Sequence, residues 1–128
     1  MKESTNPITQ KQLEGFDDVK LLVDSFYKKV NDDHVLSPVF NDFAKVDWDH
    51  HLPVMYSFWD SVLFGSMTYK GQPFPKHAAL PITTQHFDHW VTLFIETVDE
   101  HFTGPKAEEV KQRAFLIAQT FQAKLGLL

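Results

Sequence analysis

Cysteine is absent from this chain of 128 residues. Disulfides, iron–sulfur clusters, cysteine nucleophiles and thiolate zinc sites are therefore excluded. No cofactor can be attached covalently through a Cys-x-x-Cys-His motif either. Seven histidines remain as the nitrogen ligands that a transition metal could use.

Basic runs and long apolar stretches are also missing. The formal net charge is −5 with no basic segment to offset it, so nucleic acid and anionic membranes are poor partners. No apolar stretch approaches the ~20 residues that are needed to span a bilayer. The opening MKESTNPITQ lacks the apolar centre of a signal peptide, and we therefore expect a cytoplasmic location.

Aromatic residues, in contrast, are abundant, with 12 Phe, three Trp and three Tyr. Phe offers a large apolar surface without a hydrogen-bonding group, so it suits the wall of a wide cavity that excludes water. The same residues also form ordinary helical cores. Composition alone leaves both interpretations open.

The apolar pattern is helical along most of the chain. Residues 1–15 are polar, contain Pro7 and Gly15, and predict a short N-terminal arm. From Phe16 onward, apolar residues recur at spacings of three and four, which is typical of amphipathic helices. The sequence therefore predicts one all-α domain over 16–128, with main helices at about 16–30, 47–64, 83–102 and 105–125.

Capping residues and prolines mark the ends of these helices. Asp47 and either Thr83 or Thr84 stand where an N-cap is expected. Pro53 lies one turn inside the helix after Asp47 and has no N–H to donate, which predicts a late start or a kink. Residues 65–76 contain two Gly and two Pro and predict an irregular connection.

His77 is the most informative residue of the chain. It lies on a short predicted helix, at about 76–80, that Pro75 opens and Pro81 closes. A haem iron needs a neutral imidazole on a rigid mount, and a helix bounded by two prolines provides one. On spacing alone, a histidine before Ala-Ala-Leu is more often a surface or capping histidine.

Three other residues place polar groups on apolar stripes. Tyr27 and Trp90 each lie in the middle of such a stripe, and a buried donor without a partner costs about 1–3 kcal/mol. Their partners are either backbone carbonyls or a polar ligand in a shared pocket. His51 is on the inward face of its helix, whereas His50, about 100° away, should face solvent.

Six segments stand in a specific order and spacing: FYKKV (26–30), LSPVF (36–40), DWDHH (47–51), FW (58–59), GQPFPKHAALP (71–81) and FDHWVTLF (87–94). In this arrangement they resemble the truncated haemoglobins, and within them the third group. The resemblance runs from about Asp17 to the C-terminus. The paired glycines of the other groups are not present as such, which favours the third group.

The resemblance implies a globin-like, truncated two-over-two helical sandwich around a haem b. Because the chain has no cysteine, this haem would be held non-covalently. The resemblance implies that His77 is the protein ligand of the iron, and that Tyr27, His51 and Trp90 are distal ligand-binding residues. Pro53 leaves the direction of His51 open, and this side chain could swing outward as a gate.

Further contacts with the haem are implied in the same way. Phe40 is expected against the haem plane, with Phe43 as the alternative. The resemblance does not identify the residues that bind the propionates, and Lys70, Lys76 and Arg113 are only candidates for that role. The expected haem-pocket residues are Phe26, Phe40, Met55, Phe58, Trp59, Phe94, Lys76 and Arg113.

The expected function is binding of dioxygen, and of NO or CO, at a five-coordinate iron with a polar distal pocket. Donors from Tyr27 and Trp90 would each stabilise charge on bound dioxygen by about 1–2 kcal/mol and slow its release. Slow release suits chemistry with dioxygen, NO or peroxide better than oxygen transport. We expect the protein to be a monomer.

Two alternatives stay open. The first is a haem enzyme, a NO dioxygenase or a peroxidase-like protein, with a separate reductase because no flavin or nicotinamide motif is visible. The second is a haem-free helical interaction or phosphotransfer domain with His77 or His89 exposed. The His86/His89 pair lacks a third ligand of matching spacing and predicts a solvated face.

Overall fold

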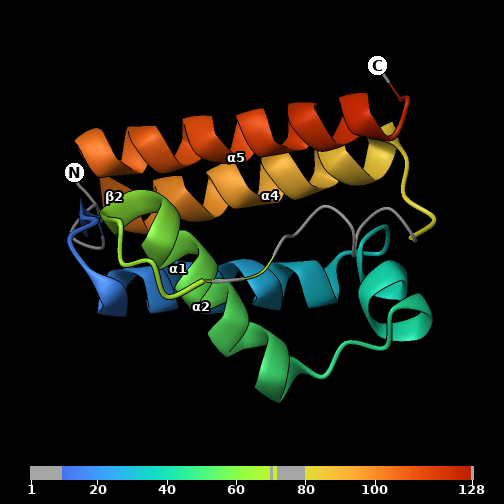
Figure 1. The fold of residues 1–128 in the computed structure, drawn as a ribbon, viewed down its shortest axis with the longest axis horizontal. Coiled ribbons are helices and arrows are strands. Elements are labelled where there is room, and N and C mark those ends of the chain that lie inside the picture. The colour runs from blue at the N-terminus through green and yellow to red at the C-terminus, as the bar shows by residue number, and fades with distance from the viewer. Residues whose placement is uncertain (1–9, 70, 72–79, 128) are drawn as a thin grey trace, which may run out of the picture.

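The computed structural model describes residues 10–69, 71 and 80–127 (Figure 1). The predicted all-α class is confirmed, since α-helices carry the fold and the strands have two residues each. The short helix expected at about 76–80 falls, apart from Leu80, outside these residues. The elements in chain order are β1 (Lys11–Gln12), α1 (Phe16–Asp32), the π-helical turn η2 (Pro38–Phe43), α2 (Trp48–Phe64), α4 (Thr84–His101), β2 (Phe102–Thr103) and α5 (Pro105–Lys124).

The long helices form two packed pairs. α4 and α5 lie side by side and run antiparallel, while α1 and α2 cross each other as the second pair (Figure 1). α1 packs against both α2 and α4 and so joins the two pairs. This arrangement is the predicted two-over-two sandwich. No helix in the described part of the chain is long and apolar enough to cross a membrane.

α1 buries one apolar stripe and begins beside a negative charge. Leu22, Phe26 and Val30, spaced by four residues, are fully buried. Asp18 in the first turn forms an ion pair with Lys11 at 2.6 Å, and a carboxylate there also interacts favourably with the helix dipole. The buried stripe determines which side chains of α1 reach the interior.

α2 begins directly after Asp47, as predicted, and continues through Pro53. The Asp47 carbonyl accepts the N–H groups of His50 at 3.1 Å and His51 at 2.8 Å, so the backbone rather than the carboxylate caps the helix. The expected late start is wrong, because Pro53 removes one hydrogen bond whose acceptor lies in the first turn. Gly65 ends the helix in the left-handed conformation at φ +68°.

The first turns of α4 and α5 show different N-terminal signals. The Thr83 N–H donates to Nδ1 of His86 at 3.0 Å, so His86 takes the place of the usual Glu or Gln of a capping box. Pro105 stands at the first position of α5, where its missing N–H costs nothing. Both helices therefore start where the sequence predicts.

The packed domain begins earlier than predicted, at residue 11 rather than 16. β1 pairs in parallel with β2. Leu13 is 2% exposed and belongs to the hydrophobic core. A two-residue pairing is too short to show the alternation by which strands are predicted, so the polar sequence of this segment indicated only an arm.

Large aromatic rings fill the interior between the helix pairs. Phe94 stacks on Trp59, with ring centroids 4.9 Å apart and planes 28° apart. Phe26 meets Phe94 edge-on at 5.1 Å. These three side chains are almost completely buried and support the wall of the cavity in which the candidate site lies.

Candidate functional site

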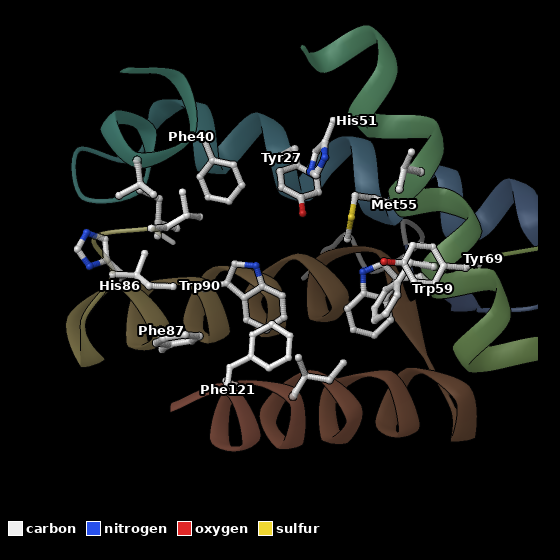
Figure 2. A pocket seen from close by; sticks show the side chains of 18 residues that line it. Tyr27, Phe40, His51, Met55, Trp59, Tyr69, His86, Phe87, Trp90 and Phe121 are labelled. Carbon is white, nitrogen blue, oxygen red and sulfur yellow. The ribbon is translucent and has the colours of Figure 1, made fainter. Parts of the chain in front are cut away.

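A cavity of about 160 Å³ lies between the two helix pairs (Figure 2). Side chains from α1, η2, α2, α4 and α5 contribute to its wall. Twelve of its lining side chains are purely apolar, namely Leu36, Val39, Phe40, Val54, Met55, Phe58, Leu80, Ile82, Phe87, Ile117, Ala118 and Phe121. Six carry a polar atom, namely Tyr27, His51, Trp59, Tyr69, His86 and Trp90.

Tyr27 places a phenol in this apolar space. It follows Phe26 on α1, is 5% exposed, and its hydroxyl points into the cavity (Figure 2). No other described residue forms a hydrogen bond with this hydroxyl. Burial raises the pKa of Tyr27, because the cavity disfavours a phenolate. Tyr27 is therefore a protonated donor whose acceptor is not supplied by the described part of the protein.

Trp90 faces Tyr27 from α4. Its ring stacks on Phe94 at 5.6 Å and meets Phe26 edge-on at 5.8 Å. The indole nitrogen and the Tyr27 oxygen are turned toward each other across the cavity (Figure 2). Within residues 10–69, 71 and 80–127 no acceptor binds this N–H. Two donors from different helix pairs thus converge on one apolar space.

His51 lies on the same side of the cavity as Tyr27. The two rings meet edge-on with centroids 5.5 Å apart, and Trp48 contacts the imidazole at the same distance. His51, in the first turn of α2 before Pro53, lines the cavity, whereas His50 is exposed. The structure therefore brings the three expected distal residues to one cavity.

The structure places four of the expected haem-pocket residues in the cavity wall: Phe40, Met55, Phe58 and Trp59. The two residues expected as alternatives for the ring against the haem plane, Phe40 and Phe43, differ in their positions. Phe40 lines the cavity, while Phe43, on the next turn of η2, is 58% exposed.

Three other expected residues lie elsewhere or form a second layer. Phe26 and Phe94 are fully buried behind the lining and support Tyr27, Trp59 and Trp90 rather than forming the cavity surface. Arg113 does not line the cavity, and its guanidinium is 3.8 Å from Glu109 on the outer face of α5. The apolar spacing along a helix shows which side chains face the protein interior, but it does not show which of them line the cavity and which lie in a layer behind the lining.

Sequence reasoning missed His86, whose ring lines the cavity. The solvated face predicted for His86 and His89 is found only in part, since both side chains are partly exposed and His89 Nδ1 lies 3.1 Å from the carboxylate of Asp33, the residue that follows α1. The spacing of four between His86 and Trp90 was the available signal, because it places both on one face of α4. No group of three metal-ligating side chains occurs in the described residues.

His77 and Lys76 lie outside the described residues, as does Lys70. The segment that contains them is bounded by Tyr69 and Leu80, and both of these residues line the cavity. In the sequence, His77 therefore stands between two residues whose side chains line the cavity.

The cavity has the features of a site for an apolar group and a small polar ligand. Its wall is mainly aromatic and aliphatic, and Tyr27 and Trp90 present donors to the interior. Together with the two-over-two helix arrangement, these features define a small helical ligand-binding protein of the globin class.

Comparison with known proteins agrees with this class. The family model of the bacterial-like globins matches residues 11–122. The group 3 truncated hemoglobin ctb of Campylobacter jejuni is 35% identical over 108 residues, which are 81% of this chain and 85% of that protein. The crystal structure of the group III truncated hemoglobin from Campylobacter jejuni matches with a TM-score of 0.81 at 33% identity, covering 88% of this chain and 91% of the other.

The chain therefore belongs to the bacterial-like globins and, within them, to the group 3 truncated haemoglobins. Membership in a globin family implies a haem. The residues present fit such a group, because the cavity offers apolar walls for a porphyrin, and the Tyr27 and Trp90 donors that face it have no acceptor among the described residues.

Proposed function

We propose that the chain binds haem b non-covalently in this cavity and uses it to bind dioxygen or another diatomic gas. His77 would be the protein ligand of a five-coordinate iron, and Tyr27, Trp90 and His51 would surround the gas. When bound, the haem supplies an iron with an open coordination position for a diatomic molecule. The observation that carries the proposal is the convergence of the Tyr27 and Trp90 donors on an apolar space.

The two donors favour a ligand that carries partial negative charge. Hydrogen bonds to charge are stronger than neutral ones, and a low-dielectric surrounding strengthens them further. Because the raised pKa of Tyr27 keeps its phenol protonated, this residue can donate at physiological pH. Such a pocket retains dioxygen, so we propose a role in dioxygen, NO or peroxide chemistry rather than in oxygen transport.

His77 is the strongest candidate for the iron ligand among the seven histidines. Tyr69 and Leu80, on either side of its segment, both line the cavity. Pro75 and Pro81 bound the segment in sequence and restrict its backbone. His51 also reaches the cavity, but it lies beside the Tyr27 donor and is therefore assigned to the side on which the gas binds.

Absorption spectra of the ferric, ferrous and carbonmonoxy protein test this proposal. We expect stoichiometric haem uptake by the purified protein, a Soret band, and a ferrous spectrum of the five-coordinate high-spin type. His77→Ala should lose this ferrous spectrum and most of the haem affinity, because the iron loses its protein ligand.

The matched control is His50→Ala, which removes an exposed imidazole from α2 and should bind haem like the unmodified protein. Failure of the unmodified protein to retain haem would contradict the proposal as a whole. An unchanged ferrous spectrum in His77→Ala would contradict the ligand assignment alone.

A further inference from the structure

Trp48 lies directly behind the distal side of the cavity. It does not line the cavity, but it contacts three rings that do. It stacks on Phe40, with centroids 5.8 Å apart and planes 20° apart. It also meets Tyr27 at 5.3 Å and His51 at 5.5 Å.

The orientation of Trp48 is itself fixed by hydrogen bonds. Its indole N–H donates to Oδ1 of Asn41 at 2.8 Å. Nδ2 of Asn41 donates to Oδ1 of Asn31 at 2.7 Å and to Oγ of Ser37 at 3.1 Å. The amide of Asn41 therefore links the first residue of α2 to the last turn of α1 and to the turn before η2.

This link matters because the Tyr27 phenol has no hydrogen bond to another described residue. Its direction is therefore set by ring packing, through Phe26 at 4.9 Å, Phe40 at 5.9 Å, His51 at 5.5 Å and Trp48. Among these neighbours, Trp48 is held by a side-chain hydrogen bond of its own and touches Tyr27, Phe40 and His51.

We propose that Trp48, anchored by Asn41, is a positioning residue that holds the Tyr27 and His51 rings in their inward orientation. The pair acts through these two residues and does not touch the gas. The consequence for ligand binding rests on the function proposed above. Loss of the anchor would let Trp48 rotate, and Tyr27 and His51 would then sample orientations in which they no longer face the cavity.

Three substitutions separate this role from general stability. Asn41→Ala removes the acceptor of the Trp48 N–H. Asn41→Asp keeps an acceptor, and rotation of the Asn31 amide and the Ser37 hydroxyl can restore their hydrogen bonds to it. Tyr56→Phe is the matched control, because it removes a different α1–α2 hydrogen bond, from Tyr56 to Asp24, away from the cavity.

Two measurements report on the positions of the rings. In the haem-loaded protein, Asn41→Ala should speed dioxygen dissociation about threefold to tenfold and split or broaden the infrared stretching band of bound CO. In the haem-free protein, NMR should show faster flipping of the Tyr27 ring and faster solvent exchange of the Trp48 indole N–H. Asn41→Asp should restore both readouts to near those of the unmodified protein.

The outcomes are distinguishable. If Asn41→Ala leaves the Tyr27 ring motion and the CO band unchanged, the positioning role is wrong. It is also wrong if Tyr56→Phe causes the same changes, because a general loosening of α2 would then explain them. If the unmodified protein binds no haem, the proposed function fails, while the NMR comparison still decides the role of Trp48.

Discussion

Tyr27 and Trp90 reach the cavity from α1 and α4, so the site depends on the packing of two helices that are far apart in sequence. Each donor is supported by other rings, Tyr27 by Phe26 at 4.9 Å and Trp90 by Phe94 at 5.6 Å. A donor that is oriented before the ligand arrives loses little entropy on binding. Both residues are therefore expected to act on ligand release more than on ligand entry.

Replacement of either donor tests this expectation. Tyr27→Phe and Trp90→Phe should each speed dioxygen dissociation about 5- to 30-fold, which corresponds to the loss of a hydrogen bond worth about 1–2 kcal/mol. The double variant should fall short of the product of the two effects if both groups donate to one ligand atom. Stopped-flow displacement of dioxygen by CO measures these rates. Unchanged rates in both single variants, or an equal increase in Tyr56→Phe, would contradict the assignment.

The sequence indicated the polar residues of the site better than its apolar boundary. Tyr27, His51 and Trp90 stand out because each places a polar group on an apolar stripe, but the stripe left backbone partners open, and their meeting at one cavity was expected from the family resemblance. Phe94 was expected on the cavity surface but lies behind it, because its depth depends on the neighbouring helix rather than on its own spacing. His86 was missed because a histidine in a first helical turn has a role in capping as well.

At the scale of elements, the N-terminus of α4 combines two functions in His86. The ring accepts the Thr83 N–H at 3.0 Å and lines the cavity. Burial and the neighbouring His89 lower the pKa of His86, while Asp33 acts in the opposite direction. Protonation would remove the acceptor from Nδ1 and place a positive charge at the positive end of the helix dipole. The first turn of α4 is therefore expected to be sensitive to acid.

His86→Gln tests this sensitivity, since Gln at the same position can accept the Thr83 N–H without titrating. A folded pKa below the ordinary value of 6.5 means that the unfolded chain takes up the proton first. The contribution of neutral His86 is therefore complete above about pH 6.5 and is lost as the pH falls through the folded pKa. Thermal unfolding from pH 7.5 to pH 5 should show that His86→Gln loses less stability than the unmodified protein, by up to about 1 kcal/mol.

His50→Gln, at an exposed position of α2, is the control and should follow the unmodified protein throughout this range. Parallel stability curves for His86→Gln and the unmodified protein would show that the cap does not titrate in this way.

The helices themselves were largely predictable, because their apolar spacing and end signals agree. The structure ends α1 at Asp32 and starts α2 after Asp47, close to the predicted limits. Of the two effects expected of Pro53, the late start is wrong, since α2 already begins at Trp48 and contains Pro53. The position of a proline in the sequence therefore indicates where a helix could be interrupted, but not whether it is interrupted there.

At the scale of the whole molecule, the N-terminal segment closes one end of the two-over-two sandwich. β1 pairs with β2, which joins α4 to α5, and the family model also matches from residue 11. Gly104, next to β2, has φ +95°, and Gln12 occupies the space that a Cβ would need. The sequence did not predict this contact, because its two partners are 91 positions apart and each is too short for a pattern.

Leu13→Ala should therefore destabilise the protein like a substitution in the core rather than in a mobile arm. Leu13 is 2% exposed and packs in the main hydrophobic cluster, so its truncation should lower the free energy of unfolding by about 2–4 kcal/mol. Leu21→Ala makes the same chemical change on α1 at a side chain that is 39% exposed, and should cost less than about 1 kcal/mol. Urea unfolding followed by circular dichroism measures both, with equal m-values as the condition for comparison. Equal small losses in the two variants would place residues 11–13 outside the cooperative unit, whereas a large loss in Leu13→Ala alone makes the N-terminal segment a part of the globin domain.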